Sequence, residues 1–291
     1  MTRILLASAA ALLIAAPALA QTTPDVAPAP ASAADLGSQL GKDNITVGVG
    51  AAYLPDYDGS NNYRVVPAPV VVGTYKGHNF SLIGNNASFD LIKQQPGPVW
   101  NIEAGPVAFV NFNRTSNNHI DDIRVKRLPE RDTAVELGGY VALDKTGVIT
   151  SPYDELSLSF SLRHDVLAKN KSYVFTPSLT YLTPLSTKLA VGLTASGTYV
   201  GTKYARYYYG VSAADSRASG LPIFNPSHDW NNYTVGGFTT YSITGDLLHG
   251  FKVIAGGTYS RTEGPSARSP LTTIAGKRNQ FIGAAGVAYT F

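Results

Sequence analysis

The 291-residue chain contains no cysteine. Disulfide bonds therefore cannot stabilise an extracytoplasmic domain, and no thiol can ligate a metal ion or act as a nucleophile. Charged residues are also scarce, at 15% of the chain, whereas soluble domains average about 25%. The composition thus argues against an ordinary soluble domain of this length.

Long apolar runs are missing beyond the N-terminus. No stretch after residue 20 has about 18 consecutive apolar residues, the minimum for a spanning helix. If the chain lies in a membrane it must do so as a β-barrel, because only helices and closed barrels satisfy the backbone there. The net charge is only +3 and the basic residues are scattered, so no nucleic-acid partner is expected.

The N-terminus has the pattern of a secretory signal. Met1-Thr-Arg3 carries one positive charge, an apolar run follows from Ile4 to Ala16, and Ala18-Leu-Ala20 closes it. We predict a signal peptide over residues 1–20 with cleavage near Ala20. Residues 21–43 are rich in Ala, Pro and Ser, and we predict that they form a disordered periplasmic tail.

From residue 44 to 291 apolar residues recur at every second position. The clearest example has Leu156, Leu158, Phe160 and Leu162 alternating with Ser157, Ser159, Ser161 and Arg163. Repeated segments of about ten residues with this alternation are typical of transmembrane strands, and helical 3.6 spacing is absent. The sequence therefore predicts an all-β, antiparallel, up-and-down transmembrane β-barrel of about 12 strands.

The predicted strands cover 45–53, 64–75, 78–83, 87–93, 99–112, 133–144, 154–166, 172–184, 188–200, 230–243, 249–260 and 280–291. Dividing 78–93 at Gly84-Asn-Asn86 gives an even strand number, as single-chain bacterial barrels have. Because short turns face the periplasm, the predicted external loops are 54–63, 84–86, 113–132, 167–171, 201–229 and 261–279.

The last strand ends the chain on an aromatic residue. Phe281, Val287, Tyr289 and Phe291 share one face of that strand. A terminal Phe preceded by alternating aromatic and apolar residues resembles the C-terminal signal that the barrel-assembly machinery reads in outer-membrane proteins. We predict that these four residues form such a signal; the alternative is an edge strand of a soluble sandwich.

Short motifs follow one another along the chain in a characteristic order. They are Leu54-Pro-Asp-Tyr-Asp-Gly-Ser60, Pro67-Ala-Pro69, Glu136-Leu-Gly-Gly139, Asp154-Glu-Leu-Ser157, His164-Asp165, Pro184-Leu-Ser186, Tyr208-Tyr-Gly-Val211, Ser269-Pro270 and Tyr289-Thr-Phe291. In this order the chain from about residue 44 onward resembles the MipA/OmpV family of MltA-interacting outer-membrane proteins. The family positions in and after the first loop are Pro55, Tyr57, Gly59, Pro67 and Pro69. Arg268 departs from the pattern, since an acidic residue is expected there.

The resemblance implies a non-enzymatic scaffold in the outer membrane that links a lytic transglycosylase and a murein synthase to that membrane. It also implies contact with outer-membrane lipid, lipopolysaccharide and the barrel-assembly machinery. Two alternatives stay open: a small-solute channel or uptake porin, and an adhesin-type surface barrel. For the channel, the charged residues expected in the lumen are Glu103, Glu136, Arg163 and Asp165. Tyr140, Phe109 and Phe238 also point inward and would obstruct it.

No catalytic, cofactor or metal site is expected. Ser161, His164 and Asp165 have the residue types of a hydrolase triad, but His164 lies on the opposite face of the strand from the other two. His119 and the Asp121-Asp122 pair have the right chemistry for a cation but lack further spaced ligands. Pro67 and Pro69 remove two backbone donors from one strand, so they are expected at a bulge or beside an unpaired stretch.

A change at the end of the last strand tests the predicted assembly signal. Phe291→Ala, or deletion of Tyr289-Thr-Phe291, should strongly reduce the yield of folded barrel in outer-membrane fractions, measured as the heat-modifiable band on gels. An equally large change in loop 201–229 should have little effect, because loops neither close the barrel nor face lipid. Equal yields for the two variants would contradict the assignment.

Overall fold

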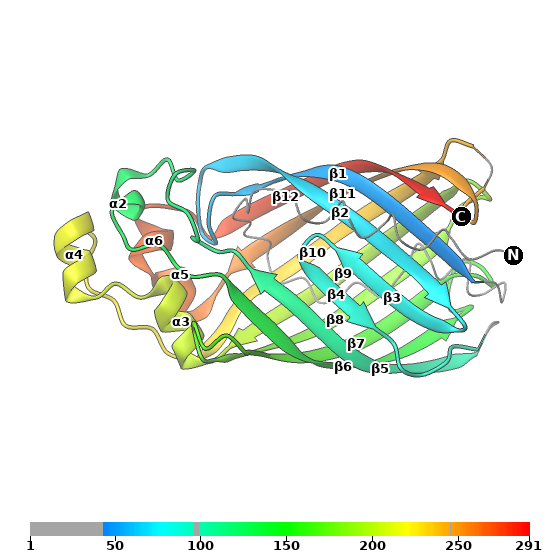
Figure 1. Cartoon of the computed structure of the whole chain (residues 1–291), viewed down its shortest axis with the longest axis horizontal. Coiled ribbons are helices and arrows are strands. Elements are labelled where there is room, and N and C mark those ends of the chain that lie inside the picture. Colours follow the sequence, from blue (N-terminus) through cyan, green and yellow to red (C-terminus); the bar gives the residue numbers. More distant parts are fainter. Residues whose placement is uncertain (1–42, 96–98, 245) are drawn as a thin grey trace, which may run out of the picture.

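The computed structural model describes residues 43–95, 99–244 and 246–291. The predicted signal peptide and nearly all of the predicted tail fall outside these residues. Twelve strands form a closed barrel in which each strand pairs with its neighbours in sequence and the last pairs with the first. Every strand pair is antiparallel, as Figure 1 shows. The predicted fold class is therefore confirmed.

The strands begin and end close to the predicted positions. They are β1 (Asn44–Pro55), β2 (Tyr63–Tyr75), β3 (His78–Ile83), β4 (Asn86–Phe89), β5 (Trp100–Asn111), β6 (Ala134–Thr146), β7 (Glu155–Asp165), β8 (Tyr173–Pro184), β9 (Leu189–Val200), β10 (Asp229–Ser242), β11 (Gly250–Thr262) and β12 (Asn279–Thr290). The division of 78–93 into β3 and β4 is confirmed. Gly84 at their turn has a φ of 60°, which glycine adopts without strain.

The predicted external loop at 84–86 is a tight turn between two short strands, since β3 and β4 have only six and four residues. On one side the N–H of Gly84 donates to the carbonyl of Pro69, 2.9 Å away and in the middle of β2. On the other side the Asn85 carbonyl accepts from the N–H of Val110, 3.0 Å away and close to the outer end of β5. The turn is therefore level with the middle of β2 and with the outer end of β5.

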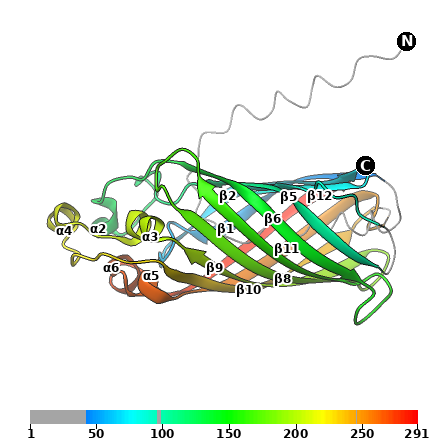
Figure 2. The same ribbon diagram turned by 90° about the horizontal axis from the view of Figure 1, so that it is seen from below.

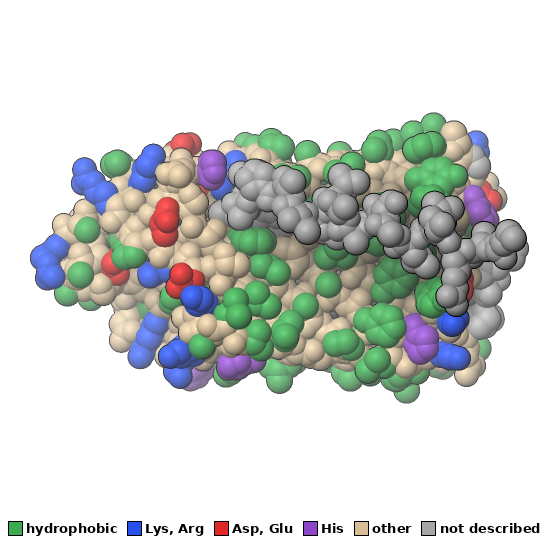
Figure 3. Space-filling model, viewed as in Figure 1, with side chains coloured by type: hydrophobic (Ala, Val, Ile, Leu, Met, Phe, Trp, Pro, Cys, Tyr) green, Lys and Arg blue, Asp and Glu red, His purple; other side chains and the backbone are tan. Residues whose placement is uncertain are grey.

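The alternation of side chains follows the barrel wall. On β7, Leu158, Phe160 and Leu162 are exposed outside the barrel, and the serines between them are buried in its interior. Apolar side chains spread over the middle of the outer surface, while charged side chains gather at the two ends (Figure 3). This arrangement gives an apolar belt that faces lipid and a polar interior.

The two ends of the barrel differ. Both β1 and β12 have their chain ends at the end with short turns, and the opposite end carries long loops with helices (Figures 1 and 2). The helices are α2 (Ile123–Lys126), α3 (Thr202–Tyr209), α4 (Ala213–Ser219), α5 (Gly264–Arg268) and α6 (Pro270–Thr273). The sequence does not predict them, since elements of four to eight residues are too short to show a period. Short turns identify the periplasmic end.

None of the helices within the described ranges is long and apolar enough to span a bilayer.

A charge at mid-height tests the lipid-facing assignment. Phe160 lies midway on β7 between Leu156, which pairs with Tyr181, and His164, which pairs with Tyr173. Phe160→Arg should destabilise the barrel by about 2–4 kcal/mol, since it places a charge in hydrocarbon. Phe160→Leu is the control and should unfold at nearly the wild-type urea concentration in lipid vesicles. Similar losses in both variants would show that this face packs against protein.

Candidate functional site

The outer mouth of the barrel is closed by its loops, and Tyr57 lies at the centre of this cap. Tyr57 is fully buried, and its hydroxyl lies 3.2 Å from the Leu271 carbonyl and 2.8 Å from that of Ala275. Burial raises the pKa of Tyr57 above its ordinary value, so the hydroxyl stays a donor. The side chain thereby ties the first loop to the last.

The backbone beside Tyr57 also joins the first loop to the last. Gly59 has a φ of 101°, and a β-carbon there would lie 3.0 Å from the Thr272 hydroxyl. The Gly59 carbonyl accepts from the N–H of Lys277 at 2.7 Å. Ser269 of the Ser269-Pro270 motif donates its hydroxyl to the Tyr209 carbonyl at 2.7 Å. These family-motif residues therefore hold loop against loop.

Arg114 is a charged residue buried inside the cap. It is fully buried, and its guanidinium donates to the carbonyls of Tyr208 at 3.4 Å and Pro129 at 3.1 Å. Burial, with a smaller effect from the charge of Arg131, lowers the pKa of Arg114 to about 9. A buried cation held by carbonyls from two loops makes those loops depend on each other.

The predicted external loop 201–229 is part of this cap and not a free surface segment. Its helix α3 buries Tyr204, Tyr208 and Tyr209 against Val174 and Val200 at the outer rim of the barrel. A control substitution in this loop, for comparison with the Phe291 variants, must therefore lie outside α3. Arg217 on α4 is a suitable position, because it is not buried.

One half of the lumen is polar and closely packed. Glu136 and Arg163, on β6 and β7, are buried and lie 3.4 Å apart. Asn111 donates to Glu136 at 3.4 Å, and the guanidinium of Arg163 lies 5.0 Å from the centre of the Phe109 ring. Removal of one partner of a buried ion pair leaves an uncompensated charge, so Glu136 and Arg163 depend on each other inside the barrel.

The other residues predicted to line a channel are buried as well. Glu103 accepts a hydrogen bond from Asn79 at 3.0 Å. Asp165 accepts from the backbone N–H groups of Leu167, Asn170 and Lys171. Tyr140 and Phe109 point inward and are buried, as predicted. These four residues are therefore buried inside the barrel.

The opposite half of the lumen holds an apolar cavity of about 300 Å³. Side chains of Val70, Ile83, Phe238, Ile254, Ile282 and Ala284 line it. Phe238 was predicted to point inward, and two glycines make room for its side chain. A β-carbon at Gly192 would lie 2.2 Å from Phe238, and one at Gly256 would lie 2.8 Å from it. The sequence shows these residues only as small or apolar members of strands, so their meeting in one cavity could not be predicted.

The cavity is bounded on the periplasmic side. Phe238 packs against a cluster of Leu182, Ala190 and Leu247. The ammonium of Lys252 donates to the Leu247 carbonyl and, at 2.6 Å, to the Thr290 hydroxyl. The turn between β10 and β11 is thereby fixed against the interior.

The connection between β6 and β7 at the periplasmic end is held by one carboxylate. The Asp154 carboxylate accepts from the backbone N–H groups of Val148, Ile149 and Thr150 at 2.5–2.8 Å. Tyr181 donates to the same carboxylate at 2.7 Å. Burial alone would raise the pKa of Asp154, but the hydrogen bonds from Thr150, Tyr181 and their neighbours hold it well below its ordinary value.

This connection presents apolar side chains to the periplasm. Ile149 is 70% exposed, and Val148 is exposed beside it. The Thr150 hydroxyl lies 2.6 Å from that of Thr183 at the end of β8, which brings the next turn and its exposed Leu185 alongside. We name Val148, Ile149 and Leu185 the periplasmic patch. Exposed apolar groups on a rigid support are typical of protein interaction sites.

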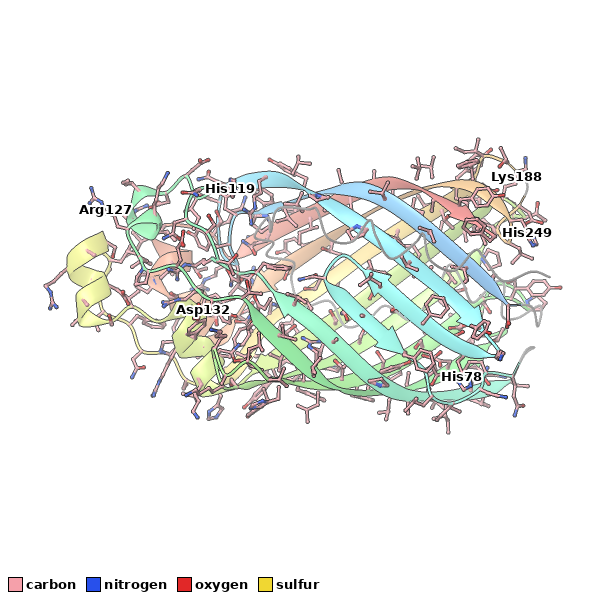
Figure 4. The ribbon with its side chains drawn as sticks, viewed as in Figure 1. His78, His119, Arg127, Asp132, Lys188 and His249 are labelled. Carbon is pink, nitrogen blue, oxygen red and sulfur yellow. The ribbon has the colours of Figure 1, made fainter. Side chains whose placement is uncertain are left out.

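The residues considered for chemistry are separated. His164 faces outward, whereas Ser161 and Asp165 are buried inside. Asp122 caps α2 and pairs with Arg124 at 2.6 Å. His119 lies at the loop end of the barrel, far from His78 and His249 at the turn end (Figure 4). Within the described part of the chain no group of three suitable side chains could hold a metal ion.

The remaining predicted residues lie in strands. Phe281, Val287, Tyr289 and Phe291 all face outward on or beside β12, and Tyr289 packs edge-on against Phe251 and Phe291, both at 4.8 Å. Their role in assembly stays a prediction. Pro55, Pro67 and Pro69 pair with β1 or β2 in unbroken register, so the bulge expected at Pro67 and Pro69 does not form between β1 and β2.

The family model described as MltA-interacting protein MipA matches residues 47–291. The chain belongs to the MipA family. A barrel of this family with its turns in the periplasm is an outer-membrane protein, as the sequence predicts. Comparison with curated protein sequences gives no match.

Solved outer-membrane channels resemble the fold at low sequence identity. A channel from Pseudomonas putida F1 is 10% identical, with 86% of this chain and 95% of that chain covered and a TM-score of 0.44. The CymD monoaromatic hydrocarbon channel is 8% identical, with 88% and 91% covered and a TM-score of 0.41. A FadL homologue from Pseudomonas aeruginosa is 9% identical, with 85% and 90% covered and a TM-score of 0.32.

Removal of one hydroxyl tests the cap. Tyr57→Phe should loosen the outer loops at a cost of about 1–3 kcal/mol, because two buried carbonyls lose their donor. Limited proteolysis of intact cells should then cut the loops around α2 and α6 faster. Tyr53→Phe, on the exposed outer face of β1, is the control and should be cut at the wild-type rate. Unchanged cleavage of Tyr57→Phe would show that Tyr57 does not hold the loops together.

Proposed function

We propose that this MipA-family barrel is a non-enzymatic scaffold that binds a lytic transglycosylase, and through it a murein synthase, at the periplasmic patch. In this proposal the signal peptide is removed near Ala20 and the assembly machinery reads the C-terminal strand. The folded barrel then lies among outer-membrane lipid and lipopolysaccharide. The description of the family as MltA-interacting supports the choice of partner.

The observation that carries the proposal is the rigid connection between β6 and β7. Hydrogen bonds from four residues to the Asp154 carboxylate hold the backbone that presents Ile149. A preorganised apolar residue loses little conformational freedom when a partner covers it. Interfaces of this kind depend on a few central apolar residues.

The closed outer mouth favours a scaffold over a hydrophilic porin. The cap around Tyr57 and Arg114 covers the mouth, and the charged residues expected to line a channel are buried. Planar-bilayer recordings should therefore show no regular conductance steps with salt alone. Large steps would favour the channel.

A binding measurement tests the patch. Ile149→Glu and Leu185→Glu should each weaken the Kd for a purified MltA-type lytic transglycosylase at least tenfold, which corresponds to about 1.4 kcal/mol. Ile223→Glu is the matched control: it is 65% exposed but lies in an external loop, and its Kd should equal that of the wild type. Binding would be followed by interferometry with the barrel in detergent micelles.

Two outcomes would contradict the proposal. The first is wild-type binding by both patch variants, which would place the partner elsewhere. The second is an equal loss in the Ile223→Glu control, which would show a general effect of added negative charge. Heat-modifiability of each variant confirms that it is folded before binding is compared.

A further inference from the structure

A pocket of about 490 Å³ lies among the external loops. Four separate segments form its walls and supply, in chain order, Arg131, Asn170, Lys203, Tyr207 and Phe224. These segments precede β6, join β7 to β8, form α3 and follow α4. Parts of the chain that are distant in sequence therefore meet in one pocket at the outer end of the barrel, away from the periplasmic patch and from the apolar cavity in the lumen.

The walls of this pocket are fixed by contacts within the protein. The Tyr207 hydroxyl accepts from the N–H of Asp132 at 2.9 Å, and the Arg131 guanidinium lies 5.0 Å from the centre of the Tyr207 ring. On another side, the backbones of Val211 and Phe224 exchange hydrogen bonds of 2.8 and 2.9 Å. The pocket is thus pre-formed, as small-molecule sites usually are.

The charged side chains that line the pocket are mostly basic. They are Arg131, Lys203, Arg206 and Asp215. None of the three cations forms an ion pair with another residue that the structure describes. The Asp215 carboxylate accepts from the N–H of Ser212 at 3.0 Å in the cap of α4, and Asp132 beside the pocket pairs with Lys169 at 3.5 Å. The lining therefore carries two net positive charges.

A fourth cation lies behind the wall. The Arg114 carbonyl accepts from the N–H of Arg131 at 2.8 Å, and the Arg114 guanidinium donates to the Tyr208 carbonyl on α3. Arg114 is fully buried, and no carboxylate of the described residues pairs with it. Solvent screens such a charge little, so it adds to the positive potential of the pocket. Because an unpaired buried charge is costly, an anion bound nearby is favoured.

The pocket lies just above the outer interface of the membrane. Helix α3 packs its tyrosines against Val174 and Val200 at the outer rim, and Figure 1 shows this helix at the outer ends of the strands. On the outer surface of the same strands, the rings of Tyr173 and Tyr199 stack with their centres 6.5 Å apart. Aromatic girdles of this kind mark the interface, so Lys203 and its neighbours lie at the level of the head groups.

We propose that the pocket binds a phosphate group carried on a sugar. A phosphate monoester has about −1.5 to −2 charges at pH 7, which match the two net positive charges of the lining better than one carboxylate does. Arg131 offers paired N–H donors that suit phosphate oxygens. A pocket of about 490 Å³ has room for more than the phosphate, and the rings of Tyr207 and Phe224 beside the Ser212 hydroxyl suit the mixed surface of a sugar.

Two phosphorylated probes test the site and separate two sources of the ligand. N-acetylglucosamine 6-phosphate represents a free solute and is titrated into the folded barrel in detergent micelles by calorimetry, with N-acetylglucosamine as the control. Lipid A represents the lipopolysaccharide of the outer leaflet and is followed by native mass spectrometry, with dephosphorylated lipid A as the control. We expect at least tenfold tighter binding of a phosphorylated probe than of its control.

The pattern of binding identifies the source. A preference for phosphate seen only with lipid A identifies lipopolysaccharide as the ligand, and one seen only with the sugar phosphate identifies a free solute. No preference for phosphate with either probe would overturn the proposal. Binding of the transglycosylase at the periplasmic patch is measured separately, so failure of one proposal leaves the other standing.

Removal of the pocket cations should remove the preference. Lys203→Gln and Arg131→Gln should each weaken binding of the phosphorylated probe at least fivefold. Arg131→Lys should lose less, because it keeps the charge and loses only the paired donors. Arg217→Gln and Lys126→Gln remove the same charges from exposed external positions outside the pocket and should bind as the wild type does. Wild-type affinity in both pocket variants, or an equal loss in the controls, would overturn the site.

Discussion

The hydrogen-bond ladder between β1 and β12 is the constraint on which the rest of the structure depends. In hydrocarbon an unpaired backbone group costs several kcal/mol, so a sheet with free edges is not a stable solution there. The closing pair joins eight positions in continuous register from Thr46 to Tyr53. Small residues such as Gly48, Gly50 and Gly286 let these two backbones approach closely, since β-carbons there would lie within 2.4–2.9 Å of their neighbours.

Closure of the barrel encloses an interior, and the two halves of this interior are lined by different kinds of side chain. Strands β5 to β7 bring Glu103, Glu136, Arg163 and Asp165 inside. Glu136 pairs with Arg163, Glu103 accepts from the Asn79 side chain, and Asp165 accepts from backbone N–H groups. Strands β9 to β12 and β1 to β3 bring glycine, alanine and aliphatic residues, which leave the cavity.

Strict alternation of apolar and polar residues allows a strand to be recognised in the sequence. This explains which parts of the structure could be predicted. Leu156 to Arg163 shows both the strand and its facing, and the even strand number required dividing 78–93. The cap could not be predicted, because Tyr57, Arg114 and Tyr208 are distant in sequence and no period links them. The cavity could not be predicted for the same reason, because the residues that line it are small or apolar members of seven different strands. The resemblance indicated that Pro55, Tyr57 and Gly59 matter, and the structure adds that Tyr57 and Gly59 bind the last loop.

The short β3–β4 hairpin also shapes the barrel as a whole. On the β2 side β3 pairs with Val70 to Tyr75, in the inner half of that strand. On the β5 side β4 pairs with Val107 to Phe109, and the turn bonds Val110 near the outer end of that strand. The hairpin therefore offsets β2 from β5 along their length. Closing a barrel requires such a stagger between strands, and here two short strands supply part of it.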